Sequence, residues 1–128
     1  MQNYHLTKCE LEVMNVVWDK GAASVQDVVD SLERPLAYTT VMTTLKILDE
    51  KRGAVRKTKQ GRAYIYEPAV AREDVRRSMA GELTETLFSG SLKSLVLSLM
   101  DPKSVSDADV QELKAAIAEL ERTQGEQR

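Results

Sequence analysis

The segment spanning residues 37–62 most constrains the fold of this chain, because it joins an amphipathic helix to a basic hairpin. Within AYTTVMTTLKILDE, Val41, Leu45 and Leu48 recur at the spacing of one helical face, which predicts that this face packs against a core. The opposite side of the same helix carries Thr39, Thr43 and Lys46. The helix is therefore expected to have one packed face and one free face.

A row of threonines is an uncommon choice for a free helical face, since β-branched residues have a lower helix propensity than Glu or Lys. In one interpretation, the short hydroxyls approach nucleic acid and bond to phosphates or base edges, and Lys46 reaches a guanine edge or a phosphate. In the other, the helix is packed and each Thr side chain bonds to a carbonyl of its own helix. The helix alone leaves both interpretations open.

The residues after this helix favour the first interpretation. Arg56, Lys57, Lys59 and Arg62 follow one another with no acidic residue between them. Gly61 separates AVRKTK from RAYIYE, and two such β-rich runs around a glycine predict a two-stranded hairpin. A basic hairpin directly after a Thr/Lys helix is the layout of a winged helix-turn-helix, although a charged run can also be a merely solvated surface.

Two helix-start signals lie before this segment. Thr7 and Glu10 have the spacing of a capping box and predict a helix from Lys8, and Ser24 and Asp27 repeat the signal for a shorter second helix. The predicted order is helix, helix, helix and hairpin. We therefore predict a mainly α fold with a small β-hairpin, in which a winged helix-turn-helix is followed by a helical dimerisation region.

The predicted boundaries follow from these signals. Residues 38–51 form the recognition helix and residues 54–67 the wing, and the DNA-binding domain covers residues 1–68. Residues 69–128 hold three amphipathic helices, which are too few to bury a stable core alone. We expect a second copy of the chain to complete this core in a homodimer, with folding back onto the winged domain as the alternative. The residues expected at the dimer interface are Leu83, Leu87, Leu92, Leu95, Val96, Leu99, Leu113, Ile117 and Leu120.

Composition excludes several classes of function. The net charge of −2 divides into about +2 for residues 1–66 and −4 for residues 67–128, so any DNA contact must be local. The chain has one cysteine, Cys9, and one histidine, His5, and no Gly-rich phosphate loop. These residues assemble no catalytic or metal site, so we expect neither an enzyme nor a cofactor. No apolar run approaches a membrane span and no signal peptide is present, which predicts a cytoplasmic protein without direct membrane insertion.

Four segments, LTKCELEVMNVVWDKG, LAYTTVMTTLKIL, GRAYIYEP and LFSGSLKSLV, resemble the BlaI/MecI penicillinase-repressor family over nearly the whole chain. The resemblance implies a homodimeric repressor that binds inverted-repeat operators in double-stranded DNA. In that family, a membrane metalloprotease sensor pathway triggers proteolysis of the repressor, as part of an antibiotic response. Carried over by position, the DNA-binding residues are Tyr38, Thr39, Thr40, Thr43, Lys46, Lys59 and Arg62, with Tyr38 on a phosphate.

The same resemblance places the cleaved bond between Ser98 and Leu99. The sequence departs from the family at Ile47, where members often carry Arg, and at Gly53, one residue later than the usual glycine, which leaves the wing register open by one residue. Residues 67–128 contain no cysteine, which disfavours the copper sensing of some relatives. The alternative function is a winged-helix adaptor that binds protein or RNA without reading an operator.

Overall fold

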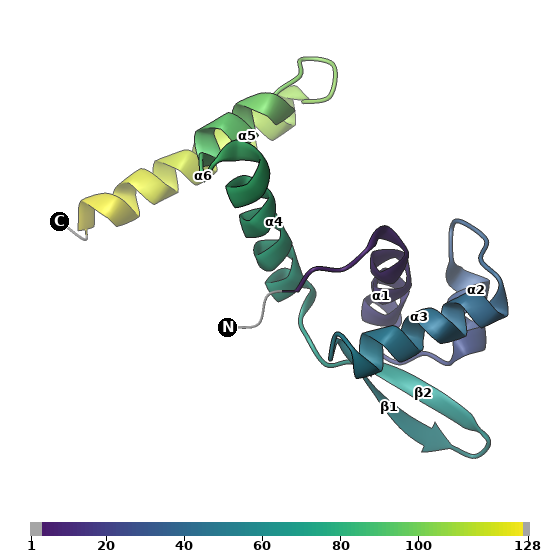
Figure 1. The fold of residues 1–128 in the computed structure, drawn as a ribbon. Coiled ribbons are helices and arrows are strands. Elements are labelled where there is room, and N and C mark those ends of the chain that lie inside the picture. The colour runs from purple at the N-terminus through teal and green to yellow at the C-terminus, as the bar shows by residue number, and fades with distance from the viewer. Residues whose placement is uncertain (1–3, 127–128) are drawn as a thin grey trace. The chain divides into compact units, whose positions relative to one another are not determined.

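The computed structural model describes residues 4–126, which form helices and one antiparallel hairpin (Figure 1). This arrangement confirms the predicted fold class. The chain divides into two compact units, Met1–Leu83 and Thr84–Arg128. The elements are α1 (Lys8–Lys20), α2 (Val25–Ser31), α3 (Tyr38–Glu50), β1 (Val55–Gln60), β2 (Ala63–Pro68), α4 (Arg72–Phe88), α5 (Leu92–Leu99) and α6 (Asp107–Glu126).

Both predicted capping boxes are present at the starts of α1 and α2. The Thr7 hydroxyl accepts a bond from the Glu10 amide at 3.2 Å, and the Glu10 carboxylate accepts one from the Thr7 amide at 3.2 Å. Ser24 and Asp27 make the same reciprocal pair at 3.1 and 3.0 Å. Each box satisfies two amides that a helix start leaves without an internal partner. These caps fix where the two helices that support α3 begin.

An apolar core fills the N-terminal unit and holds α3 by its packed face. Val41, Leu45 and Leu48 are fully buried, as the helical spacing predicted. They meet buried residues of α1 and α2 in one continuous cluster. Trp18 packs at the edge of this cluster, and its indole N–H donates to the Val70 carbonyl at 3.0 Å. The free face of α3 is thus backed by a packed core.

The two strands of the hairpin pair in a defined register, so the one-residue uncertainty that the position of Gly53 left in the sequence is removed. Gly53 adopts a φ of 62°, a left-handed conformation that suits glycine, and the Ala54 amide then donates to the Leu48 carbonyl at 2.8 Å. The strands pair from Val55↔Pro68 to Gln60↔Ala63, which leaves a two-residue turn. Gly61 has a φ of 63° and is the only turn residue with positive φ, the pattern of a type II′ hairpin turn.

The first compact unit extends past the boundary that the sequence predicted. It continues to Leu83 and does not end at Pro68, because the first turns of α4 belong to its core. Val75 is buried and Met79 packs against the core cluster. The N-terminal segment also contacts this part of α4, since the Tyr4 amide donates to the Ser78 hydroxyl at 2.8 Å. The amino-acid composition changes at Pro68, but the packed core of the first unit continues beyond this residue into α4.

The second unit contains the end of α4 with α5 and α6, and it buries no side chain among residues 84–126. Ser91 caps α5, accepting from the Ser94 amide at 3.1 Å. Ser106 and Asp109 form a further capping box at the start of α6, with distances of 3.1 and 3.3 Å. Local capping therefore defines these helices, whereas their apolar residues do not enclose a core within the unit.

A part-buried ion pair joins the start of α1 to the junction between α3 and the hairpin. The Arg52 Nε donates to the Glu10 carboxylate at 3.0 Å, and the Glu10 side chain is only 6% exposed. Burial raises the pKa of Glu10, but the hydrogen bonds from Arg52 and Thr7 and the Arg52 charge outweigh it, so the pKa lies below 4.5. The ionised carboxylate is therefore part of the folded state.

We predict that Glu10→Gln lowers the free energy of unfolding by about 1–3 kcal/mol at pH 7, because Arg52 loses a charged, buried acceptor. A native pKa below the unfolded value contributes stability above about pH 4.5 that is lost as pH falls through the native pKa. The variant should therefore lose less stability on acidification than the parent. Urea unfolding at pH 7 and below pH 4 measures both effects. Glu33→Gln, at an exposed loop carboxylate, should change neither, and equal losses for the two variants would contradict the assignment.

Candidate nucleic-acid interface

The exposed surface of α3 carries the three residues that helical spacing placed on its free face and the two that the family resemblance added. Tyr38 is 48% exposed, and the side chains of Thr39, Thr40, Thr43 and Lys46 are also exposed. Figure 1 shows α3 beside the β1–β2 hairpin within the N-terminal unit. The helix thus offers hydroxyls and an ammonium group on a surface bordered by the hairpin.

The hydrogen bonds of α3 distinguish the two interpretations of its threonines. Thr44, which faces inward, bonds to its own helix: its hydroxyl donates to the Thr40 carbonyl at 2.8 Å and lies 3.6 Å from the Cys9 sulfur. Thr39, Thr40 and Thr43 make no such bond to any residue between 4 and 126. Self-bonding therefore accounts for the buried Thr44 and not for the exposed row, whose hydroxyls are free for a ligand.

The start of α3 also differs from the starts of α1 and α2. Its N-cap is Ala37, which has no side-chain oxygen and makes no capping bond. The first amides of a helix have no internal acceptor, and the helix dipole makes this end attractive to anions. An uncapped start beside Tyr38 and Thr39 is therefore compatible with a phosphate oxygen as the missing acceptor.

One basic residue of the hairpin is held in place by the protein itself. The Lys57 ammonium lies 4.9 Å from the centre of the Tyr64 ring and 3.9 Å from the Asp49 carboxylate of α3. Tyr66 is buried on the same strand face, where burial raises the pKa of its phenol. Lys57 therefore ties the hairpin to α3.

The other cations of this surface have no such partner. Within residues 4–126, no carboxylate lies within 4.0 Å of Lys46, Arg56, Lys59 or Arg62. Strand alternation places Lys59 on the Lys57 face, which contacts α3, while Arg62 lies in the turn. Lys59 can therefore act together with α3, and Arg62 extends the positive surface to the hairpin tip.

Two exposed residues of this surface were not among the sequence-based candidates. Met42 on α3 is 45% exposed, and Tyr64 on β2 is also 45% exposed. The helical spacing contains a signal for Met42, because it lies one turn from both Tyr38 and Lys46. No comparable signal exists for Tyr64, whose exposure depends on how the hairpin packs.

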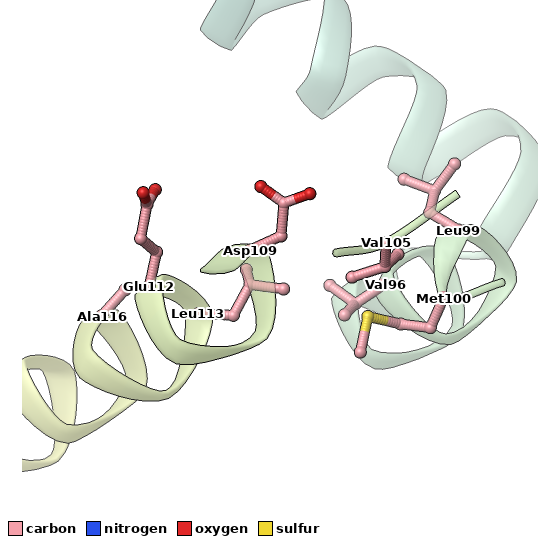
Figure 2. Close-up of a pocket in the computed structure, with 8 residues that line it drawn as sticks. All are labelled: Val96, Leu99, Met100, Val105, Asp109, Glu112, Leu113 and Ala116. Atoms are coloured by element: carbon pink, nitrogen blue, oxygen red, sulfur yellow. The ribbon is translucent and has the colours of Figure 1, made fainter. Parts of the chain in front are cut away.

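Apolar residues of the second unit remain at its surface. Val96, Met100, Val105 and Leu113 line a groove of about 510 Å³ between α5 and α6, with the carboxylates of Asp109 and Glu112 at its rim (Figure 2). The residues predicted for dimerisation in this unit are the exposed Leu87, Leu92, Val96, Leu99, Leu113, Ile117 and Leu120 and the half-buried Leu95; the exposed Leu83 is the last residue of the first unit.

Among residues 4–126, no cluster of three or more His, Cys, Asp or Glu side chains could hold a metal ion. His5 contacts a carboxylate, with its Nδ1 3.0 Å from Glu82. None of the helices described is long and apolar enough to cross a bilayer.

Three helices around one core, with the third free on one face and followed by a basic hairpin, define a winged helix-turn-helix, the class of DNA-binding domain that presents its third helix to the major groove. The chain belongs to the penicillinase repressor family, whose model matches residues 6–119. This confirms the resemblance seen in the sequence.

Individual relatives agree with this membership. The chain is 33% identical over 120 residues to the transcriptional regulator BlaI of Mycobacterium tuberculosis, covering 91% of this chain and 85% of the relative. It is 27% identical over 116 residues to the penicillinase repressor of Bacillus licheniformis, covering 89% and 90% of the two chains. A solution structure of the DNA binding domain of the repressor BlaI superimposes with a TM-score of 0.50 and 29% identity, covering 57% of this chain and 90% of that domain.

Proposed function

We propose that this chain is a homodimeric transcriptional repressor that binds an inverted-repeat operator in double-stranded DNA. The observation that carries the proposal is the free face of α3, where exposed hydroxyls and Lys46 lie next to the unpaired cations Lys59 and Arg62 of the hairpin. Relatives named as repressors, one with a solved DNA binding domain, support the same function. As a repressor the chain would work in the cytoplasm, and no catalytic activity is part of the proposal.

The roles of the residues follow from their chemistry and position. Thr39, Thr43 and Lys46 form the centre of the free face and would meet base edges in the major groove. Tyr38 and Thr40 lie near the uncapped start of α3 and would hold phosphates. Lys59 and Arg62 would neutralise phosphates beside the groove, which fixes the register of the domain without reading sequence.

The second unit would supply the dimer contacts. Its helices bury no side chain within residues 84–126. Leu92, Leu99, Ile117 and Leu120 are each more than half exposed. Exposed apolar surface on this scale is typical of an interaction site, and a second copy presents a matching surface under two-fold symmetry. Pairing would also place two recognition helices on two half-sites.

Repression would be relieved by proteolysis in α5 under a membrane metalloprotease sensor. Ser98 and Leu99 both lie at the exposed end of this helix. A protease needs an extended substrate, and α5 has only 8 residues, so its last turn can open at low cost. A cut there would separate α6 from the rest of the chain.

Substitutions at two cations test the division between base reading and phosphate binding. Lys46→Ala should weaken binding to a selected operator by about 1–3 kcal/mol while affecting a scrambled duplex less, because the lost contact is to a base. Arg62→Ala should weaken both duplexes alike. Fluorescence anisotropy at constant salt measures both, with the operator selected from random duplexes by the full-length chain. Lys103→Ala, a matched charge change in the second unit, should have little effect, and equal losses on both duplexes for Lys46→Ala would refute its base-reading role.

A further inference from the structure

Met42 is an exposed aliphatic side chain on a face that otherwise carries threonines, Lys46 and Tyr38. It is 45% exposed, although the packed face of α3 is completed by Val41, Leu45 and Leu48. Its neighbours one turn away are Tyr38 and Lys46, and the next residue along the chain is Thr43. An exposed methionine at this point neither closes the core nor adds to the solubility of the helix.

Its position on α3 lies between the Thr row and the hairpin. Met42 and Asp49 are seven residues apart, which places them on the same side of the helix. Asp49 contacts Lys57 of β1, so this side faces the hairpin. Thr39 and Thr43 lie on the other side of Met42 along the free face. The methionine therefore lies between the threonines that we assign to DNA and the basic hairpin, and not at an outer edge of that surface.

The chemistry of the major groove offers an apolar side chain one partner among the base edges. Every base edge presents hydrogen-bond donors or acceptors there, and thymine adds an apolar group, its C5-methyl, beside its O4 acceptor. A methionine side chain is long, flexible and polarisable, so it can follow a methyl group without a fixed geometry. Thr39, Thr43 and Lys46 border Met42, whereas a protein partner would need a contiguous apolar patch.

We propose that Met42 contacts a thymine methyl in each operator half-site and is a specificity-determining residue of this repressor. The inference rests on the proposed function, because it requires α3 to lie in the major groove. It adds a definite feature to the DNA: each half-site contains a thymine whose methyl group contributes to affinity through Met42 alone.

The test uses thymine-to-uracil replacement, which removes the methyl group and keeps every base-pairing group. Each thymine of the selected operator is replaced in turn, symmetrically in both half-sites, and the affinity of the full-length chain is measured by anisotropy. Loss of one buried methyl corresponds to a factor of about 4, so two half-sites should lose about 10–20-fold at one thymine position. Met42→Ala should bind the thymine and uracil duplexes of that position equally.

Two matched variants separate the methyl contact from general effects on binding. Lys46→Ala should bind more weakly overall but retain the full difference between thymine and uracil. Met42→Leu keeps an apolar side chain and should retain part of that difference. Neither Met42 variant should change the thermal unfolding midpoint, since the side chain does not close the core.

The inference is overturned if no uracil duplex binds more weakly than its parent, if Met42→Ala still discriminates between them, or if the selected half-site contains no thymine. These results leave operator binding itself intact. A chain that shows no preference for any duplex over scrambled DNA contradicts the proposed function as well, so the two failures are distinguishable.

Discussion

Truncation of the chain after Ser98 should lower its affinity for a two-half-site operator by about 10²–10⁴-fold and leave its affinity for a single half-site nearly unchanged. Linked winged domains bind the second half-site at a high effective concentration, and that gain disappears when the link is lost. The truncation removes α6, with the exposed Leu113, Ile117 and Leu120, and ends α5 one residue early. Sedimentation gives the association state and anisotropy the two affinities.

A single substitution checks the same link at full chain length. Ile117 is 54% exposed in the protomer, so Ile117→Asp costs the isolated chain little. Within an apolar interface the same carboxylate would be buried without a partner, which is expensive. We expect this variant to sediment as a monomer and to bind operators as the truncated chain does. Ala115→Asp, two positions away on another face of α6, should remain dimeric.

The result of the truncation has a clear interpretation because the winged unit ends at Leu83, well before the cut. The unfolding midpoint of the winged unit should therefore change little on truncation, which a thermal unfolding experiment can verify. A truncated chain that stays dimeric and binds the operator as tightly as the intact one would eliminate release by cleavage at Ser98–Leu99. An Ile117→Asp variant that stays dimeric would remove α6 from the interface.

Short-range signals predicted much of this fold. Thr7 with Glu10, and Ser24 with Asp27, lie three residues apart, and each pair forms the expected box. Gly61 forms the hairpin turn, and the apolar spacing of α3 identified its packed face. These features are encoded within one or two turns of chain, where the geometry of helix and strand fixes which residues meet.

Contacts between distant residues could not be predicted in the same way. The Glu10–Arg52 pair joins residues 42 positions apart, and the Trp18–Val70 bond spans 52 positions. Val75 belongs to the winged unit because its side chain reaches that core, although the composition changes at Pro68. Such pairs depend on how the elements pack, which local pattern does not contain.

In the candidate site, too, local patterns were predictable from the sequence and contacts between distant residues were not. Periodicity found Thr39, Thr43 and Lys46, because one face of a helix can be read directly from spacing. It could not show that Thr44 takes the self-bonding role, or that Asp49 and Tyr64 hold Lys57. The DNA, dimer and cleavage assignments remain predictions, since each requires a partner molecule.

Raising the salt concentration should weaken DNA binding steeply. Each protomer presents Arg56, Lys59 and Arg62 without a carboxylate partner within residues 4–126, and Lys46, which we assign to a base edge, adds a fourth positive charge beside the phosphates. If each protomer neutralises about 4 phosphates, the log–log slope for the dimer should be near −7. Affinity should then fall about 10⁴-fold between 50 and 200 mM salt. Anisotropy titrations with a labelled duplex across this range measure the slope.

The most direct test of the central claim is this titration carried out on the selected inverted repeat and on a scrambled duplex of the same length and composition. We predict a slope near −7 on the operator and, at each salt concentration, affinity for the operator at least about 10³-fold above that for the scrambled duplex. A slope near zero, or equal affinity for the two duplexes, would contradict a sequence-reading repressor and favour an adaptor that binds protein or RNA.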